Sequence, residues 1–407
     1  MTRGRLLVLT PRFPYPVIGG DRLRIHAICR ALARDHSLTL LSLCERREDF
    51  DPALVDDAVF DRIERVHLPR WRSLAQTALA IPGRTPLQVA YYRSPAFARR
   101  VAALLPQHDL ALAHLIRTGD HLLRERTIPT VLEMTDAISM NYARVREHGV
   151  KGIRARIYAI EQARLRAYEA RMPRYFDTVS LIADTDAANL WGNDLPSNLV
   201  VASNGVDCDA LPFRDRTGNP PVAVFIGNMH SAQNMDACRY FVQDILPLLP
   251  EATVREFRIV GRIRDGDAAW LRQHPRVTVT GEVASIPAEV ADAAIGVCPV
   301  RIGAGVQNKV LEYMALGLPT VSSPVGHEGL AAVASRDLLV AATPTDFVAA
   351  IEQIITDPAL ATALARHARQ FVEERHGWDA TLRPLTDRIG AMIATSTRSR
   401  IASSARS

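Results

Sequence analysis

Two glycines, a lysine and a glutamate lie close together in residues 301–321, which read RIGAGVQNKVLEYMALGLPTV. Gly303 and Gly305 let backbone N–H groups approach a ligand closely, because glycine has no side chain in the way. A helix is expected to begin at about Asn308, and a helix N-terminus combines unpaired N–H donors with the positive end of the helix dipole. This arrangement suits an anion of the size of a diphosphate.

The charged residues of the expected helix fit the same ligand. Lys309 lies in the first turn, where a cation is unfavourable unless an anion binds beside it. Glu312, nearly one turn further on, offers two acceptor oxygens of the kind that hold the two hydroxyls of a ribose. A solvated pair of opposite charges on a surface helix explains the same spacing, and the residues alone leave both interpretations open.

Apolar runs rich in leucine and β-branched residues alternate with helical patterns along the whole chain, which predicts parallel sheets built from βαβ units. In such sheets ligands bind beyond the carboxyl ends of the strands. In the first half the pattern predicts strands at residues 6–10, 37–44, 110–115, 130–133 and 178–182, and helices at 21–34 and 140–172. In the second half it predicts strands at 222–226, 257–260, 277–280, 294–299, 319–322 and 338–340, and helices at 235–249, 268–274, 308–316 and 345–355.

A cluster of Ser, Asn, Gly and Pro at residues 202–221 interrupts this alternation and predicts a linker between two domains. We therefore expect an N-terminal domain at residues 1–203 and a second domain at 204–375, followed by one more helical pattern at 376–394. Residues 395–407 are mostly Ser, Arg and Ala with little apolar surface to bury, so we expect disorder there.

Residues 301–321 resemble the donor-site segment of family 4 glycosyltransferases, in particular the bacterial exopolysaccharide-type members. The run NKVLEYM at 308–314, followed by Gly317, Pro319 and Val321, carries this resemblance. The resemblance extends over most of the chain and implies an α/β protein of the GT-B fold, in which two doubly wound, Rossmann-like lobes face a central cleft. The helix at 376–394 would close the fold by returning to the first lobe.

The resemblance also implies an activity. A sugar would move from a nucleotide diphosphate donor to a saccharide, lipid-linked or small-molecule hydroxyl acceptor, with retention of the anomeric configuration. Because the protein itself can neutralise the diphosphate, we expect no metal site and no cofactor beyond the nucleotide diphosphate sugar as co-substrate.

In the second half the resemblance implies that Glu312 binds the ribose and Lys309 the phosphates. The other residues expected to bind the donor are Gly227, Asn228, Arg262, Gly281, Val283, Gly305, Val306, Gln307 and Asn308. A guanidinium at Arg262 suits a phosphate, although a surface salt bridge explains this residue equally well. Two positions depart from the family pattern. Ala304 replaces a glutamate that commonly contacts the donor sugar, and residues 230–235 lack the usual Arg and Lys.

In the first half the resemblance implies that Gly19 and Gly20 face the diphosphate, that His114 touches the donor sugar, and that Asp136 lies in an acceptor-side loop. We group His114 with Lys309 and Glu312 as the catalytic candidates. Each first-half residue has a plain structural alternative, because Gly-Gly turns are common, a strand-end His is often structural, and an Asp caps helices.

Composition limits the remaining possibilities. A net charge of +5 over 407 residues is mild for a nucleic-acid binder, and we expect no nucleic-acid partner. The five cysteines show no metal-ligand spacing, and no run is apolar enough to span a membrane, so we expect a cytoplasmic protein. The basic helix at 140–172 could contact anionic lipid at the inner face of a membrane. It could equally be a solvated face, since Glu161 and Glu169 interleave with its arginines.

Three other protein classes share parts of this pattern. A nicotinamide-dependent dehydrogenase has similar sheets, but the first strand here lacks the G-x-G-x-x-G sequence after it. A GT-B-shaped epimerase or phosphorylase, and a non-catalytic subunit that binds nucleotide sugars, both remain open. Slow hydrolysis of the donor without acceptor would favour the transferase, whereas binding without turnover would favour the non-catalytic subunit.

Overall fold

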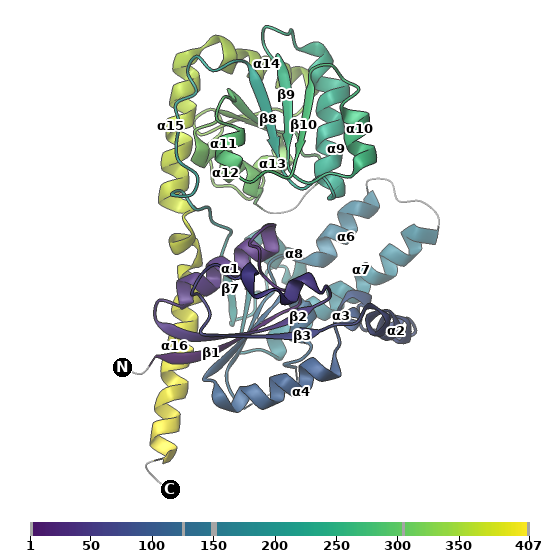
Figure 1. Ribbon diagram of the computed structural model, residues 1–407, viewed down its shortest axis with the longest axis vertical. Helices are drawn as coiled ribbons and strands as arrows, with labels where there is room; N and C mark the ends of the chain where they lie inside the picture. The colour runs from purple at the N-terminus through teal and green to yellow at the C-terminus, as the bar shows by residue number, and fades with distance from the viewer. Residues whose placement is uncertain (1–2, 124–126, 148–152, 303–305, 405–407) are drawn as a thin grey trace. The chain divides into compact units, whose positions relative to one another are not determined.

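The computed structural model describes residues 3–123, 127–147, 153–302 and 306–404. The chain divides into two compact units: unit 1 is Met1–Ser203 with Leu382–Ser407, and unit 2 is Asn204–Thr381. Each unit contains one parallel sheet with helices on both of its faces (Figure 1). The predicted α/β class with two doubly wound sheets is therefore confirmed.

Unit 1 has a seven-stranded sheet in the order β3-β2-β1-β4-β5-β6-β7. Its strands are β1 (Gly4–Thr10), β2 (His36–Cys44), β3 (Arg62–His67), β4 (Leu110–His114), β5 (Thr130–Glu133), β6 (Thr178–Leu181) and β7 (Leu199–Val201). Its helices are α1 (Gly20–Leu32), α2 (Arg70–Ala80), α3 (Leu87–Tyr91), α4 (Pro95–Leu104), α5 (Leu115–Gly119), α6 (Ile138–Glu147), α7 (Ile153–Arg171) and α8 (Asp184–Trp191). The central strands are buried on both faces, as their unbroken apolar sequences require.

Unit 2 has a six-stranded sheet in the order β10-β9-β8-β11-β12-β13. Its strands are β8 (Val222–Ile226), β9 (Glu256–Val260), β10 (Val277–Gly281), β11 (Ile295–Cys298), β12 (Thr320–Ser322) and β13 (Leu339–Val340). Its helices are α9 (Ala232–Tyr240), α10 (Asp265–Leu271), α11 (Ile286–Glu289), α12 (Asn308–Leu316), α13 (Pro324–His327), α14 (Pro344–Thr356) and α15 (Pro358–Arg375). One large apolar core fills this unit.

In each sheet the order in which the chain adds strands reverses at one place. In unit 1 the strand order reverses between β1 and β4, and in unit 2 it reverses between β8 and β11. The loops that leave the carboxyl ends of the two strands at such a switch point run to opposite faces of the sheet, which leaves a crevice for a ligand. The segment before α12 is one of these loops.

Helix α12 is fixed on its sheet by a tyrosine that packs on a glycine. A Cβ atom on Gly296 of β11 would lie only 2.6 Å from Cγ of Tyr313, so only glycine leaves room for the ring. The Tyr313 hydroxyl accepts a bond from the Ile226 N–H at 2.9 Å and donates one to the Val297 carbonyl at 3.3 Å. Strands β8 and β11 therefore both position the helix that carries Lys309 and Glu312.

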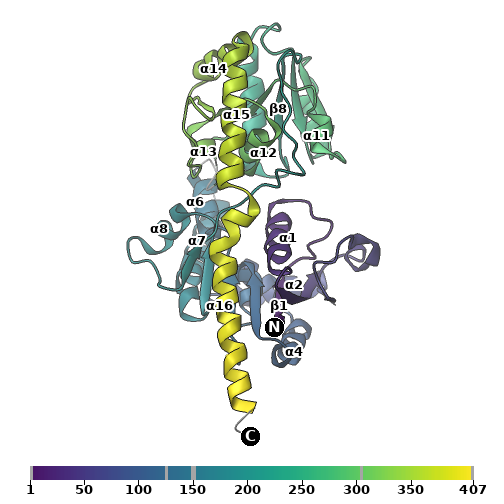
Figure 2. The same cartoon turned by 90° about the vertical axis from the view of Figure 1, so that its left-hand side faces the viewer.

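The last helix, α16 (Trp378–Ser404), belongs to both units, because its residues from Leu382 onward are part of unit 1 (Figure 2). There Arg388 Nε donates to Thr178 Oγ1 at 3.2 Å. We expected disorder from residue 395, but the helix continues to Ser404. The segment contains neither Gly nor Pro after residue 390, and extending an existing helix costs little.

Several elements differ from the expected ones. The helix expected at 140–172 is two helices, α6 and α7, with residues 148–152 outside the described part of the chain. The helix expected at 235–249 is α9 followed by a π-helical turn at Phe241–Ile245 and a 3₁₀ turn at Leu246–Leu248. Strands β3 and β7 and helices α2, α3, α4 and α15 were not expected.

The substitution Gly296→Ala tests the packing of α12. We expect it to lower the free energy of unfolding by about 1–3 kcal/mol, because the added methyl group forces Tyr313 off the sheet. Gly266→Ala in α10 is the matched control, since nothing lies within 4 Å of its Cβ position. Thermal denaturation of both variants is the measurement, and equal melting temperatures would contradict this description of the interface.

Candidate active site

Lys309 is a buried cation near the start of α12. Its side chain is 8% exposed, and its Nζ donates to Gln307 Oε1 at 3.1 Å and lies 5.4 Å from the centre of the Phe225 ring. No carboxylate among the described residues forms an ion pair with it. A buried ammonium without a counter-ion is costly, so this site is suited to an incoming anion.

Glu312 lies one turn further along α12 and is partly buried. Burial raises its pKa from 4.5 to about 7, and the positive charge of Lys309 opposes this rise. The two side chains do not form an ion pair, so the interpretation as a solvated surface pair does not fit the structure. Near neutral pH the carboxyl is only partly ionised, and hydroxyl groups that bonded to it would stabilise its charged form.

The backbone at the start of α12 adds further polar groups. Gln307 is the N-cap residue, and its side chain makes no capping bond to the helix. The Asn308 Oδ1 atom is buried and has no hydrogen-bond partner among the described residues. Val306 is buried, whereas Gly305, like Gly303 and Ala304, lies outside the described residues. The described part of this segment therefore offers a cation, an unpaired amide oxygen and helix N–H groups within three residues.

The loops after β8, β9 and β10 are joined to one another by backbone bonds. Gly227 N–H donates to the Val260 carbonyl at 2.9 Å, and Gly261 N–H donates to the Gly281 carbonyl at 2.9 Å. Gly261 has φ 129°, and a Cβ there would lie 2.0 Å from the Gly227 carbonyl oxygen. This close contact explains why glycine occupies position 261.

Three other expected donor residues lie on these loops. Asn228 Oδ1 accepts from the His230 N–H at 3.0 Å and so shapes its own turn. The Val283 side chain packs against the core of unit 2, which leaves only its backbone for a ligand. Arg262 forms an ion pair with Glu282, and both side chains are nearly half exposed. Such a pair contributes little stability, so Arg262 can exchange it for another anion.

In unit 1 a buried chain of charged groups ends at His114. Arg24, Glu133 and His114 are each at most 2% exposed. Arg24 Nε donates to Glu133 Oε1 at 2.7 Å, and His114 Nδ1 lies 2.6 Å from Glu133 Oε2. Burial acts to raise the pKa of Glu133, but Arg24 and His114 outweigh it and lower the pKa from 4.5 to about 2.

The ionised Glu133 fixes the tautomer of His114. A carboxylate only accepts hydrogen bonds, so the proton of the imidazole sits on Nδ1. The Nε2 atom is then an acceptor in the neutral ring. It is buried and has no partner among the described residues. His114 therefore presents Nε2 without a partner among the described residues at the carboxyl end of β4.

The backbone is strained just after His114 and just after Glu133. Leu115, directly after His114, has φ 65°, and Thr135, two residues after Glu133, has φ 66°. Non-glycine residues in this region are strained, and such strain tends to accumulate at functional sites. Thr135 N–H and Oγ1 also donate to Glu133, at 2.9 and 3.0 Å to its two oxygens.

The other expected residues of unit 1 lie on neighbouring loops. Gly19 has φ 100° and is the N-cap of α1, whose first residue is Gly20. Asp136 accepts from Asn141 Nδ2 at 2.8 Å, and burial raises its pKa. The expected site residues thus form two groups, one at the carboxyl end of each sheet. Arg24 and Glu133 were not among them.

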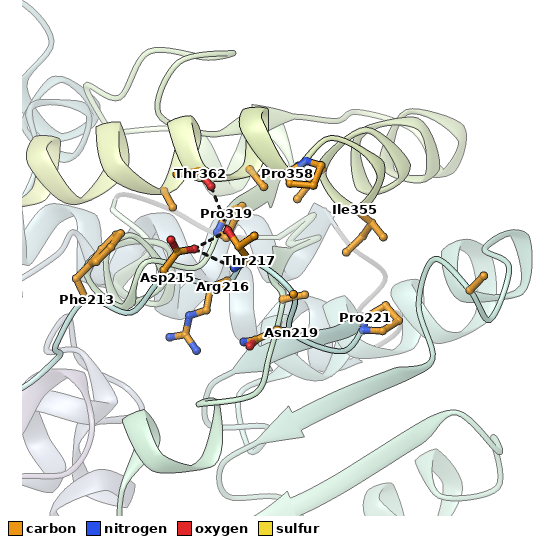
Figure 3. A pocket seen from close by; sticks show the side chains of 16 residues that line it. Phe213, Asp215, Arg216, Thr217, Asn219, Pro221, Pro319, Ile355, Pro358 and Thr362 are labelled. Carbon is orange, nitrogen blue, oxygen red and sulfur yellow. Dashed lines mark hydrogen bonds between the residues drawn. The ribbon is translucent and has the colours of Figure 1, made fainter.

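One cavity in the described residues lies elsewhere. It has a volume of about 150 Å³ and is lined by residues that precede strands of unit 2, namely Pro221, Ala294 and Pro319, and by residues of α14 and α15 (Figure 3). This is the amino end of the sheet, opposite to α12. Its volume is also well below the ~300–1,000 Å³ of typical ligand sites, so we assign it no role in binding the substrate.

The variant Glu133→Gln tests the buried charges of unit 1. A carboxylate whose pKa is lowered by folding adds stability above pH 4.5, and this contribution is lost as the pH falls toward 2. We expect the variant to be less stable by about 3 kcal/mol at pH 7, and the difference to shrink below pH 4.5. Urea denaturation between pH 2.5 and 7 measures this, with the exposed Glu48→Gln as control. A difference that does not change with pH would refute the assignment.

No single helix in the described residues is long and apolar enough to cross a membrane. The helices Pro344–Thr356 and Pro358–Arg375 reach the necessary length and apolarity only when they are taken together, and the chain bends by 102° between them. No group of three or more His, Cys, Asp or Glu side chains in the described ranges is placed to hold a metal ion.

Comparison with known proteins identifies the family of the second unit. Residues 220–357 match the family described as glycosyl transferases group 1. No well-characterised protein gives a significant match by sequence. These matched residues contain α12 with Lys309 and Glu312, and the loops after β8, β9 and β10.

Solved structures match nearly the whole chain. HepE from Anabaena, solved in complex with UDP, is 15% identical with a TM-score of 0.69, and the match covers 95% of this chain and 100% of HepE. Sucrose-phosphate synthase from Thermosynechococcus elongatus is 15% identical with a TM-score of 0.71, covering 96% and 100%. WaaG, a glycosyltransferase involved in lipopolysaccharide biosynthesis, is 15% identical with a TM-score of 0.65, covering 94% and 99%. The prediction of a glycosyltransferase of the GT-B fold is thus confirmed: residues 220–357 match glycosyl transferases group 1, and the fold of the chain is that of GT-B glycosyltransferases.

Proposed function

We propose that this glycosyltransferase takes its sugar from a nucleoside diphosphate donor whose diphosphate binds at the start of α12. The observation that carries the proposal is the buried Lys309 ammonium, which has no carboxylate partner among the described residues. A diphosphate there would supply the missing negative charge and would also accept from the N–H groups of the first helical turn. The structure of the similar HepE in complex with UDP supports this class of donor.

Glu312 is the proposed ligand of the ribose. Its carboxyl lies on the same helix as Lys309, and the two ribose hydroxyls can each donate to one of its oxygens. Such bonds stabilise the ionised form, so they would lower the raised pKa of Glu312 on binding. The proposal therefore makes nucleotide affinity increase with pH through about 7.

Stabilising the leaving group is the main catalytic task of this site. As the glycosidic bond to the diphosphate breaks, negative charge grows on the phosphate oxygens. Lys309 and the N–H groups of α12 lie together at the start of the helix, where they would stabilise this charge in the transition state. Because the protein itself supplies this positive charge, we propose that the reaction needs no metal ion. We also propose that it retains the anomeric configuration, as the resemblance to family 4 implies.

His114 is the proposed contact to the transferred sugar. Its tautomer is fixed by Glu133, and its free Nε2 can accept from a sugar hydroxyl.

For the acceptor we propose a saccharide or a lipid-linked saccharide. The similar WaaG, a glycosyltransferase involved in lipopolysaccharide biosynthesis, supports this class of acceptor. All five cysteines are free thiols, which fits the reducing cytoplasm, and we place the reaction there.

Binding of nucleoside diphosphates by variants of α12 tests the proposal. We expect Lys309→Met and Glu312→Gln each to weaken the binding of UDP, GDP or ADP, whichever the protein prefers, by at least tenfold. Both substitutions keep the side-chain volume, so the helix should stay in place. Isothermal titration calorimetry is the measurement, with Glu251→Gln as an exposed control in the same unit. Unchanged affinity in both α12 variants would refute the site.

The stability of Glu312→Gln provides an independent check. Folding raises the pKa of Glu312 to about 7, so the wild-type carboxylate destabilises the folded state progressively as the pH rises from 4.5 to above 7. We expect the variant to be more stable than the wild type by about 1–3 kcal/mol at pH 8, and equally stable below pH 4.5. Thermal denaturation at both pH values decides this. A variant that is less stable at pH 8 would show that Glu312 has a structural role.

A further inference from the structure

Helix α2 exposes its apolar face and buries its polar one. Trp71, Leu74 and Leu79 are 66%, 63% and 74% exposed, and Ile81, directly after the helix, is 59% exposed. The side of the helix that is turned toward the protein carries small or polar residues, namely Ser73, Gln76, Thr77 and Ala80. Ser73 is fully buried, and its hydroxyl oxygen has no hydrogen-bond partner among the described residues.

The exposed apolar residues of α2 lie on one side of the helix. At 100° per residue the side chains of Trp71, Leu74, Ala75, Ala78 and Leu79 fall within one continuous arc of roughly 140°. The buried residues fall on the opposite arc. A helix with an apolar stripe of this width normally packs that stripe on the core. Here the same stripe points to solvent, which indicates that it contacts something other than its own chain.

Helix α7 extends the exposed apolar surface. Ile157 and Ile160 are 52% and 54% exposed. They lie on one face of α7 with Arg164, three and four residues apart, and Arg164 Nη2 donates to the carbonyl of Ile81. Helix α2 also packs on α3, near the edge of unit 1 (Figure 1). We call the exposed side chains of Trp71, Leu74, Leu79 and Ile81 the α2 face.

The surroundings of the α2 face are basic. From Arg65 to His108 the chain contains seven arginines and no acidic residue, and of these arginines Arg93 and Arg100 form ion pairs with Asp120 and Glu64. Arg70 and Arg72 are exposed at the two borders of the apolar arc, and the Arg72 guanidinium lies 5.0 Å from the centre of the Trp71 ring.

The two acidic residues of α7 are buried, and Glu161 Oε2 lies 3.9 Å from Arg164 Nη1. Glu161 is buried, and its Oε1 accepts from the Leu87 N–H. Glu169 is fully buried, and its oxygens accept from the Ser139 N–H at 3.3 and 3.4 Å. They therefore do not interleave with the arginines on a solvated face, contrary to the alternative considered from the sequence.

We propose that the α2 face is a docking surface for a bilayer with anionic lipids, with α2 lying in the plane of the membrane interface. Aliphatic side chains and a tryptophan bordered by arginines match the acyl chains and the negative headgroups of such an interface. A second copy of the chain fits less well, because two-fold pairing of this face would place arginines opposite arginines. The inference does not depend on the donor site, and its test requires no nucleotide.

Co-sedimentation of the full chain with vesicles tests the inference. We expect binding to vesicles of phosphatidylglycerol and phosphatidylcholine, and little binding to phosphatidylcholine alone. The triple variant Trp71→Ser, Leu74→Gln, Leu79→Gln should bind at least tenfold more weakly. The double variant Arg70→Gln, Arg72→Gln should lose about fivefold per arginine at low salt. A control with Leu195→Gln and Leu248→Gln, which are similarly exposed elsewhere, should bind like the wild type.

A second readout follows Trp71 directly. Its fluorescence should shift to shorter wavelength on binding and should be quenched by brominated lipids, and both effects should disappear in Trp71→Phe. Absence of binding to anionic vesicles at low salt would overturn the inference, as would equal binding by the triple variant. A wild-type dimer in analytical ultracentrifugation that the triple variant dissociates would assign the face to a second copy instead. All substituted side chains are exposed, so unchanged thermal stability confirms that a loss of binding is not a loss of folding.

Discussion

The buried ammonium of Lys309 is the feature on which this account of the donor site depends. A charge at 8% exposure whose only hydrogen-bond partner among the described residues is a neutral amide is unfavourable in the free protein. It persists because the packing of Tyr313 on Gly296 holds α12 on β8 and β11. The fold thus tolerates the unfavourable burial of the Lys309 charge at a place where a bound anion would compensate that charge. Local destabilisation of this kind is a common property of binding sites.

In unit 1, in contrast, the buried charges are paired with one another. Glu133 has both a buried guanidinium and an imidazole as partners, and its ionised form is stabilised. Arg24 also donates to the carbonyls of Ala202 and Ser203, at 2.8 and 3.3 Å. These are the last residues of unit 1 before the chain enters unit 2. One carboxylate therefore fixes the imidazole of His114 and, through Arg24, the end of the unit.

The fold could be predicted largely from the sequence, because buried parallel strands are continuous apolar runs. Strands β5 and β8 and helix α12 have the expected bounds. Strand β3 was missed because it is an edge strand whose sequence, RIERVH, alternates polar and apolar residues. Helix α15 was missed although Asp357 and Pro358 form a regular helix start, since its apolar residues are spread between arginines and alanines.

The site was only partly predictable. The types and spacing of Lys309 and Glu312 indicated a diphosphate and a ribose, but burial decides between that interpretation and a surface pair, and burial is not visible in two residues. The partners of His114 come from positions 24 and 133, which only the order of the strands brings together. The exposed face of α2 could not be predicted either, because the sequence of an amphipathic helix does not show which side faces the core.

A crystal structure of the chain with UDP or the preferred nucleoside diphosphate tests the central claim most directly. We predict a phosphate oxygen within hydrogen-bond distance of Lys309 Nζ and both ribose hydroxyls on the carboxylate of Glu312. A nucleotide bound elsewhere, with the bond from Lys309 Nζ to Gln307 Oε1 intact and the carboxyl of Glu312 free of ligand, would contradict the account.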